Sequence, residues 1–318
     1  MGMLSEPGEP APPAASGSEG ESSSPAEATP GGTDSSGPSA QGTGAQGSAA
    51  EQPAELPLAA GAEPAPAAGS PGTSDETPGE TAQMPPPVVA QPPPVRLENV
   101  LVFTRTIGFR HDSIGPGVEA LRRLGQDNGF AVEQTEDPAD FSDESLARYD
   151  VVLWLSTDGD VLDEAGQQAF QRYIRAGGGW VGVHAATATE YGWAWYGQLI
   201  GGGAYFLGHP VIQSARVQVE ISDHPSTQHL PQSFTVQDEL YSFRTNPRSS
   251  VRVLMTLDES SYGVGDLAMG DHPIAWYHEF EGGRAWYTAL GHPIAWYSDA
   301  RFTQHLLGGI RWAAGAAP

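Results

Sequence analysis

Apolar residues are sparse in the first third of the chain and regularly spaced in the rest. Residues 1–96 contain no aromatic residue and consist mainly of Pro, Ala, Gly, Ser and Glu. Such a segment buries too little apolar surface to offset the entropy lost on ordering. We therefore predict a disordered tail or tether over residues 1–96 and a single folded domain over residues 97–318.

The first half of the folded part alternates between two kinds of apolar spacing. Apolar runs at 98–106, 131–137, 147–156 and 180–183 predict strands. Helical spacing predicts helices over 115–129 and 163–176, ended by Gly129 and Gly177. Strands that alternate with helices in this way indicate an α/β fold with a doubly wound, mainly parallel sheet. Ligands of such sheets bind beyond the carboxyl ends of the strands.

The second half has the spacing of antiparallel strands. Apolar and polar residues alternate over 215–221 and 250–258, and residues 272–292 read as a hairpin that turns at 281–284. The helical stripe over 299–313 predicts a last helix. The predicted architecture is therefore a parallel sheet extended by a C-terminal hairpin.

Charge and composition exclude several functional classes. The net charge is −24, and 12 of the 39 acidic residues precede Arg96, which leaves 27 acidic and 15 basic residues, about −12, in the folded part. No basic stripe appears, so we expect no nucleic-acid partner. The absence of cysteine excludes disulfides, zinc–thiolate sites and a cysteine nucleophile. No glycine-rich phosphate loop follows the first strand, so we expect no nucleotide cofactor.

The sequence leaves the compartment and the oligomeric state open. No apolar run reaches the length of a transmembrane helix, and the first residues do not form a signal peptide. A long Pro/Ala/Ser tether often follows a secretion signal or a lipid anchor. A cell-envelope or extracellular location would follow if the true start of the chain lay upstream.

Polar residues gather where the predicted strands end. Because the carboxyl ends of parallel strands share one edge of the sheet, we expect the flanking segments to converge on one cleft. The candidates that follow strands or lie between them are Arg110, His111, His184, His209, Glu239, Tyr241, Arg244 and His292. Imidazole and carboxylate groups serve both as acid–base catalysts and as metal ligands.

Six segments resemble the trehalose-utilisation (ThuA-like) domain family. They read "VFTRTIGFRHDSI", "GGGWVGVHAA", "DHPSTQHLP", "DELYSFRTNP", "DHPIAWYHEFEGGRAWYTALGH" and "HLLGGIRWAAG". The resemblance covers residues 98–315 and none of the tail. It implies a flavodoxin-like fold of the class I glutamine amidotransferase type and a role in carbohydrate metabolism, with a small-molecule sugar as the partner.

The same resemblance limits the chemistry. In glutamine amidotransferases the fourth strand ends in a cysteine nucleophile, and a later catalytic histidine is followed by Pro-Glu. Here His184 stands at the nucleophile position, and His292 is followed by Pro293 and Ile294. Amide hydrolysis through a thioester is therefore excluded. The chain also departs from the family after His292, where the hexapeptide "HPIAWY" of 272–277 recurs at 292–297.

Three functional hypotheses remain. The leading one is an enzyme that acts on a keto-sugar or disaccharide by acid–base chemistry, with His184, Glu239, His292 and His111 as catalytic residues. Substrate binding would fall to Arg110, Arg244, Tyr241, Trp193 and Trp195. A zinc or manganese site would use His184, His209, Glu239 and His292. The alternatives are a non-catalytic, tethered carbohydrate-binding module and an interaction domain.

Overall fold

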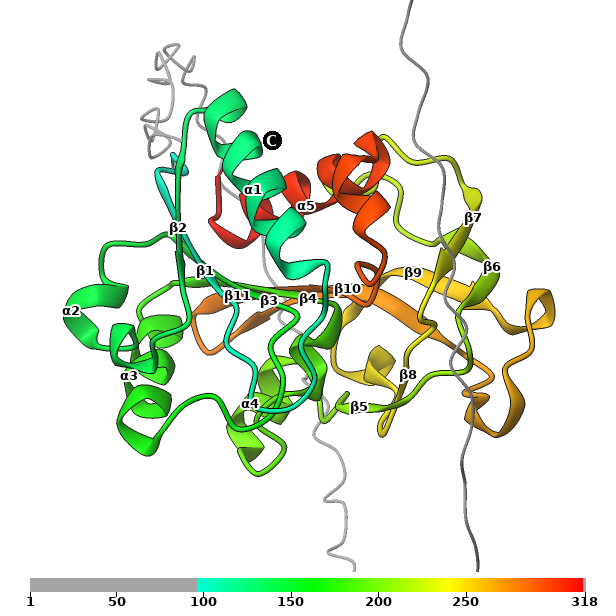
Figure 1. The fold of residues 1–318 in the computed structure, drawn as a ribbon, viewed down its shortest axis with the longest axis horizontal. Helices are drawn as coiled ribbons and strands as arrows, with labels where there is room; N and C mark the ends of the chain where they lie inside the picture. The colour runs from blue at the N-terminus through cyan, green and yellow to red at the C-terminus, as the bar shows by residue number, and fades with distance from the viewer. Residues whose placement is uncertain (1–95, 317–318) are drawn as a thin grey trace, which may run out of the picture. The chain divides into compact units, whose positions relative to one another are not determined.

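A computed structural model describes residues 96–316, and within them the chain forms one large sheet with helices on both faces (Figure 1). The predicted tail lies outside the described residues except for Arg96. The strands are β1 (Asn99–Phe103), β2 (Ala131–Thr135), β3 (Val151–Leu155), β4 (Gly179–Val183), β5 (Phe206–Gly208), β6 (Gln213–Val219), β7 (Ser233–Asp238), β8 (Ser242–Phe243), β9 (Arg252–Asp258), β10 (Pro273–Phe280) and β11 (Gly283–Thr288). The helices are α1 (Ile114–Asn128), α2 (Asp143–Leu146), α3 (Glu164–Arg175), α4 (Ala194–Leu199) and α5 (Ala300–Ala313).

The large sheet has the strand order β2-β1-β3-β4-β11-β10-β9-β6-β7, and its first five strands are parallel. Figure 1 shows α1 and α5 on one face of these strands and α2, α3 and α4 on the other. Because both faces are covered, β3 and β4 are buried along their whole length. This arrangement confirms the predicted α/β fold with a doubly wound, mainly parallel central sheet.

The last four strands extend the sheet by antiparallel pairing, through β10, β9 and β6 to β7. Four antiparallel pairings lie between β11 and β7, and each one reverses the strand direction. Strand β7 therefore runs in the same direction as β11. The carboxyl ends of β4, β11 and β7 therefore face the same edge of the sheet. Although three strands separate β11 from β7, their carboxyl ends meet through hydrogen bonds of Asp238, which requires this half of the sheet to curl.

The helix boundaries follow the signals in the sequence closely. Helix α3 occupies 164–175 of the predicted 163–176, because the Asp163 carboxylate caps its first turn at the backbone N–H of Gly166. Gly177 ends it with a φ of 103°, and Gly129 ends α1 with a φ of 77°. Strand β7, the small β5–β8 sheet and the short helices α2 and α4 were not predicted from the sequence. Within residues 96–316, no helix has the length and apolarity needed to cross a bilayer.

Two histidines are buried around a turn that packs beneath α5. The His305 ring donates from Nδ1 to the backbone oxygen of Ser226 at 2.7 Å, and His224 Nδ1 lies 2.8 Å from Ser226 Oγ. Both side chains are almost fully buried. Burial lowers the pKa of His305 to about 3 and that of His224 to about 4, because a charged imidazole would lose its hydration. Both rings are therefore neutral structural groups at neutral pH.

These two histidines should make the stability of the domain dependent on pH. In the unfolded chain these histidines have a pKa of about 6.5, whereas in the folded chain they become protonated only near pH 3 to 4. Between these pH values the unfolded chain binds more protons than the folded chain, so acid favours unfolding. Between pH 7 and pH 5, we expect His305 alone to account for a loss of about 2 kcal/mol in the free energy of unfolding. In urea unfolding, the free energy of unfolding of His305→Gln should therefore fall by about 2 kcal/mol less between pH 7 and pH 5 than that of the unmodified protein. An unchanged pH dependence in this variant would contradict the assignment.

Candidate functional site

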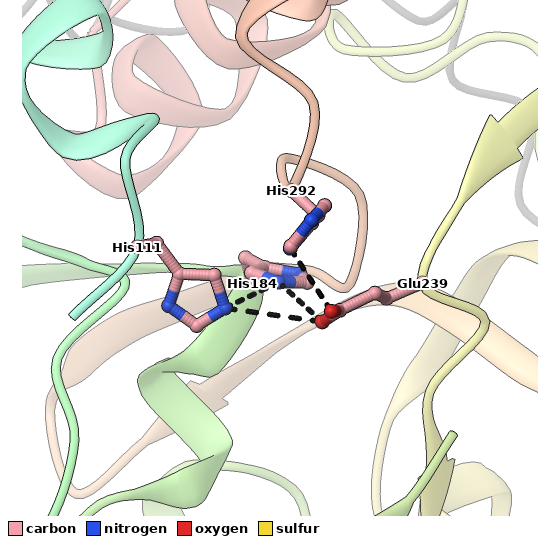
Figure 2. Close-up of side chains that lie close together, drawn as sticks. All are labelled: His111, His184, Glu239 and His292. Carbon is pink, nitrogen blue, oxygen red and sulfur yellow. Dashed lines mark hydrogen bonds and ion pairs between the residues drawn. The ribbon is translucent and has the colours of Figure 1, made fainter. Parts of the chain in front are cut away.

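Four side chains from distant parts of the sequence converge at the carboxyl edge of the sheet (Figure 2). His111 lies in the loop between β1 and α1, and His184 directly follows β4. Glu239 directly follows β7, and His292 follows β11. Each offers one nitrogen or carboxylate oxygen, and these four atoms lie within 4.8 Å of one another. Three imidazoles and one carboxylate at this spacing form a donor set suited to a divalent metal ion.

His184 is the buried centre of this group. It has a φ of 55°, which is rare for a residue other than glycine and turns the chain sharply at the end of β4. Its Nδ1 donates to the backbone oxygen of Ala289 at 2.8 Å, which leaves the lone pair on Nε2. That lone pair faces His111 Nε2 at 3.1 Å and the Tyr241 hydroxyl at 3.0 Å. Burial lowers the pKa of His184 to about 4, so the ring is neutral at physiological pH.

The Glu239 carboxylate lies among the imidazoles. Its oxygens are 3.3 Å from His184 Nε2, 3.1 Å from His292 Nδ1 and 3.8 Å from His111 Nε2. Burial alone would raise the pKa of Glu239, but its close contacts with the imidazoles of His111 and His184 lower the pKa well below its usual range. The carboxylate is therefore ionised, and it is the negative charge of the cluster.

Asp238 holds the turn that carries His292. Its buried carboxylate accepts hydrogen bonds from the backbone N–H groups of Gly291, His292 and Glu239 and from Trp296 Nε1, at distances of 2.7–3.2 Å. Asp238 thus joins the end of β7 to the chain after β11. Asp238 was not among the candidates predicted from the sequence. A signal existed in "SFTVQD", where apolar Phe234 and Val236 alternate with polar residues and predict a strand that ends at this aspartate.

His209 and Tyr241 lie beside the four-residue group. His209 Nε2 is 3.6 Å from Glu239, while its Nδ1 donates to the backbone oxygen of Pro210. Its side chain is 32% exposed, in contrast to the fully buried His184. Tyr241 packs its ring on His184, with 4.3 Å between ring centroids. In the set of four, the structure thus has His111 where the sequence analysis expected His209, because the loop after β1 folds back over the end of β4.

The two predicted arginines are engaged elsewhere. Arg110 forms an ion pair with Glu136 at 2.6 Å and donates to the backbone oxygen of Thr104. Arg244 places its guanidinium 4.3 Å from the ring centroid of Tyr191. Within residues 96–316, neither side chain forms a hydrogen bond or ion pair with the cluster. Their predicted role in substrate binding has no support from these contacts.

The two predicted tryptophans belong to the packing around α4. Trp193 is buried and stacks on Tyr196, with 5.8 Å between ring centroids. Trp195 donates from Nε1 to Glu281 at 2.8 Å. Glu281 lies in the turn before β11, which is at the opposite edge of the sheet from His292. The geometry therefore does not bring either indole to the cluster.

Comparisons with known proteins agree with this architecture. The ThuA family, described as trehalose utilisation, matches residues 99–313, and the chain belongs to this family. A ThuA-like protein from Bacteroides uniformis has 28% identity and a TM-score of 0.58 over 68% of this chain and 91% of its own. A ThuA-like protein from Parabacteroides merdae shares the fold, with 21% identity and a TM-score of 0.55 over 69% of this chain and 90% of its own. No curated protein matches the chain significantly.

The role of Asp238 can be tested with an isosteric change. In Asp238→Asn an amide nitrogen replaces one carboxylate oxygen, and two of the four N–H donors lose their acceptor. Each unpaired buried donor costs about 1 kcal/mol or more, so we expect the free energy of unfolding to fall by about 2 kcal/mol. Urea unfolding measures this loss. The exposed Asp223→Asn is the matched control, and equal stabilities of the two variants would contradict the role.

Proposed function

We propose that this protein is a metal-dependent enzyme that acts by proton transfer on a keto-sugar or a related disaccharide. The observation that carries the proposal is the convergence of His111, His184, Glu239 and His292 within 4.8 Å. The name of the family supports the sugar as the class of substrate. The acid–base chemistry is our inference from the residue types and their geometry.

Several features of the cluster favour a metal ion over a purely organic site. Neutral imidazoles and an ionised carboxylate bind zinc or manganese without first releasing protons, and His184 and Glu239 are in those states. The Nδ1 hydrogen bond of His184 to a backbone oxygen is the usual way to orient a ligating imidazole. The buried nitrogen His292 Nδ1 has no well-aligned hydrogen-bond partner among residues 96–316, which a bound cation would supply.

Different residues at the cluster would bind the metal ion and transfer the proton. A divalent ion at the four ligands would polarise a carbonyl or hydroxyl oxygen of the sugar. His184 is too deeply buried to exchange protons with a substrate, so we assign it to the metal. His209 is more exposed, its Nδ1 hydrogen is held by Pro210, and its Nε2 lone pair is free to take a proton. We therefore assign the role of general base to His209.

Metal analysis of the purified protein is the first test. We expect about one equivalent of zinc or manganese per chain, removed by a chelator and restored by the metal. His184→Ala and Glu239→Gln should each lower the metal content strongly, because each removes one of four ligands. His278→Gln is the matched control, since His278 is a half-buried histidine that bonds the backbone oxygen of Leu199 outside the cluster. A fully metal-loaded His184→Ala protein would refute the site.

Exchange of substrate hydrogen with solvent is the second test. In D₂O, a keto-disaccharide should incorporate deuterium beside its carbonyl group in the presence of the metal-loaded protein, as followed by NMR. His209→Ala should keep its metal yet lose about 10²–10⁴-fold in the rate of exchange, because it lacks the base. Sugar binding without exchange, unaffected by His184→Ala, would instead favour the non-catalytic binding module. The absence of any sugar binding would favour an interaction domain.

A further inference from the structure

Large apolar side chains that are exposed gather around the histidine cluster. Within residues 96–316, every exposed large apolar residue lies within four positions of His111, His209 or His292 in the sequence. They are Ile107, Phe109, Leu207, Val211, Ile212 and Ile294, with exposed fractions of 47–82%. Single exposed apolar residues are ordinary, but their restriction to the segments around three histidines of the site marks a binding surface. We call these six residues the apolar rim.

A cavity of about 490 Å³ adjoins the cluster on the side of His292. His292 and the rim residue Ile212 both line it, together with Pro293, Ala295 and Trp296. The cavity therefore connects the polar centre of the site with the apolar rim. Its volume is in the range of pockets that hold small molecules.

The charged groups of this cavity are already paired. Arg301 and Asp299 both line it and form an ion pair with each other at 2.5 Å. The Asp299 carboxylate also accepts from the backbone N–H of Arg301 at the start of α5. Their hydrogen-bonding capacity is therefore largely committed within the protein. Thr235 and Gln237 add polar groups to the lining, but Ile212, Pro293, Ala295 and Trp296 make much of the wall near His292 apolar. An apolar group that enters the cavity would therefore bury apolar surface against these residues.

The position of the rim determines the kind of occupant. Its residues lie within four positions of His111, His209 or His292, so a protein that covered the rim permanently would also cover the cluster. A ligand that reaches the cluster with one end and the rim with the other avoids this conflict. On the basis of the proposed function, we propose that the substrate is a glycoside with an apolar aglycone, an aryl or alkyl group. The sugar lies at the cluster, and the aglycone enters the cavity against Ile212 and Pro293.

Calorimetric titration of the zinc-loaded protein with a matched set of ligands tests this proposal. The set consists of methyl and phenyl glucosides in both anomers, their keto derivatives, and trehalose as a disaccharide. Burial of a phenyl ring should make the preferred phenyl glycoside bind about tenfold or more tightly than its methyl counterpart. Equal affinities for methyl and phenyl compounds would overturn the aglycone proposal and leave the proposed function intact. Tighter binding of trehalose than of any phenyl compound would assign the cavity to a second sugar and overturn it as well.

Variants of the rim make the test specific. Ile212→Ser should abolish most of the phenyl preference and leave the affinity for the methyl glycoside unchanged. Ile107→Ser is the matched control, because Ile107 is an exposed rim residue outside the cavity lining. An equal loss of preference in both variants would overturn the assignment of the aglycone to this cavity. If Ile212→Ser converted a dimer to a monomer, the rim would be an interface between copies. Failure of every glycoside to bind the zinc-loaded protein would refute the proposed function together with this inference.

Discussion

The carboxylate of Asp238 is the interaction on which the geometry of the site depends. It accepts N–H groups from the end of its own strand and from the turn after β11, although three strands separate these two positions in the sheet. A buried carboxylate is costly unless it is fully hydrogen-bonded, and this one has four donors. The curl of the sheet brings the donors of the chain after β11 within hydrogen-bonding distance of Asp238. Asp238 therefore both requires the curl and stabilises it.

The chemistry of the cluster follows from this closure. Once Asp238 is fixed, the next residue, Glu239, extends toward His184 and His292 (Figure 2). The negative charge of Glu239 then lies in a pocket walled by imidazoles, where burial keeps His184 neutral. An ionised carboxylate among imidazole nitrogens is a better match for a divalent cation than for an anionic substrate. The same closure leaves the apolar loop residues facing outward around the cluster.

Local signals in the sequence were sufficient for the ends of β4 and β11, but not for the end of β7 or for the contacts within the site. His184 and His292 were predicted from apolar runs that end in histidine, and Glu239 from its flanking apolar residues. The presence of His111 rather than His209 in the group of four depends on how the loop after β1 folds over β4, which no periodic pattern encodes. Trp193 and Trp195 were predicted to bind sugar because an aromatic ring can stack on the face of a sugar. The same ring can also pack in a protein core, and the sequence alone does not distinguish the two. Their contacts show packing, and only the direction of each ring in the folded chain distinguishes the two uses.

The hexapeptide "HPIAWY" separates what the sequence determines from what the tertiary structure decides. Apolar periodicity, helix caps and glycine stops determined the parallel half of the sheet, because these preferences act over a few residues. At 272–277 the hexapeptide enters strand β10, and Ile274 is 1% exposed; at 292–297 it enters a 3₁₀ helix (Ile294–Ser298), and Ile294 is 51% exposed. Identical residues cannot specify two conformations by themselves. Pairing with β9 and β11 makes the first copy a strand, while the hydrogen bonds of Asp238 to His292 and Trp296 hold the second copy at the site.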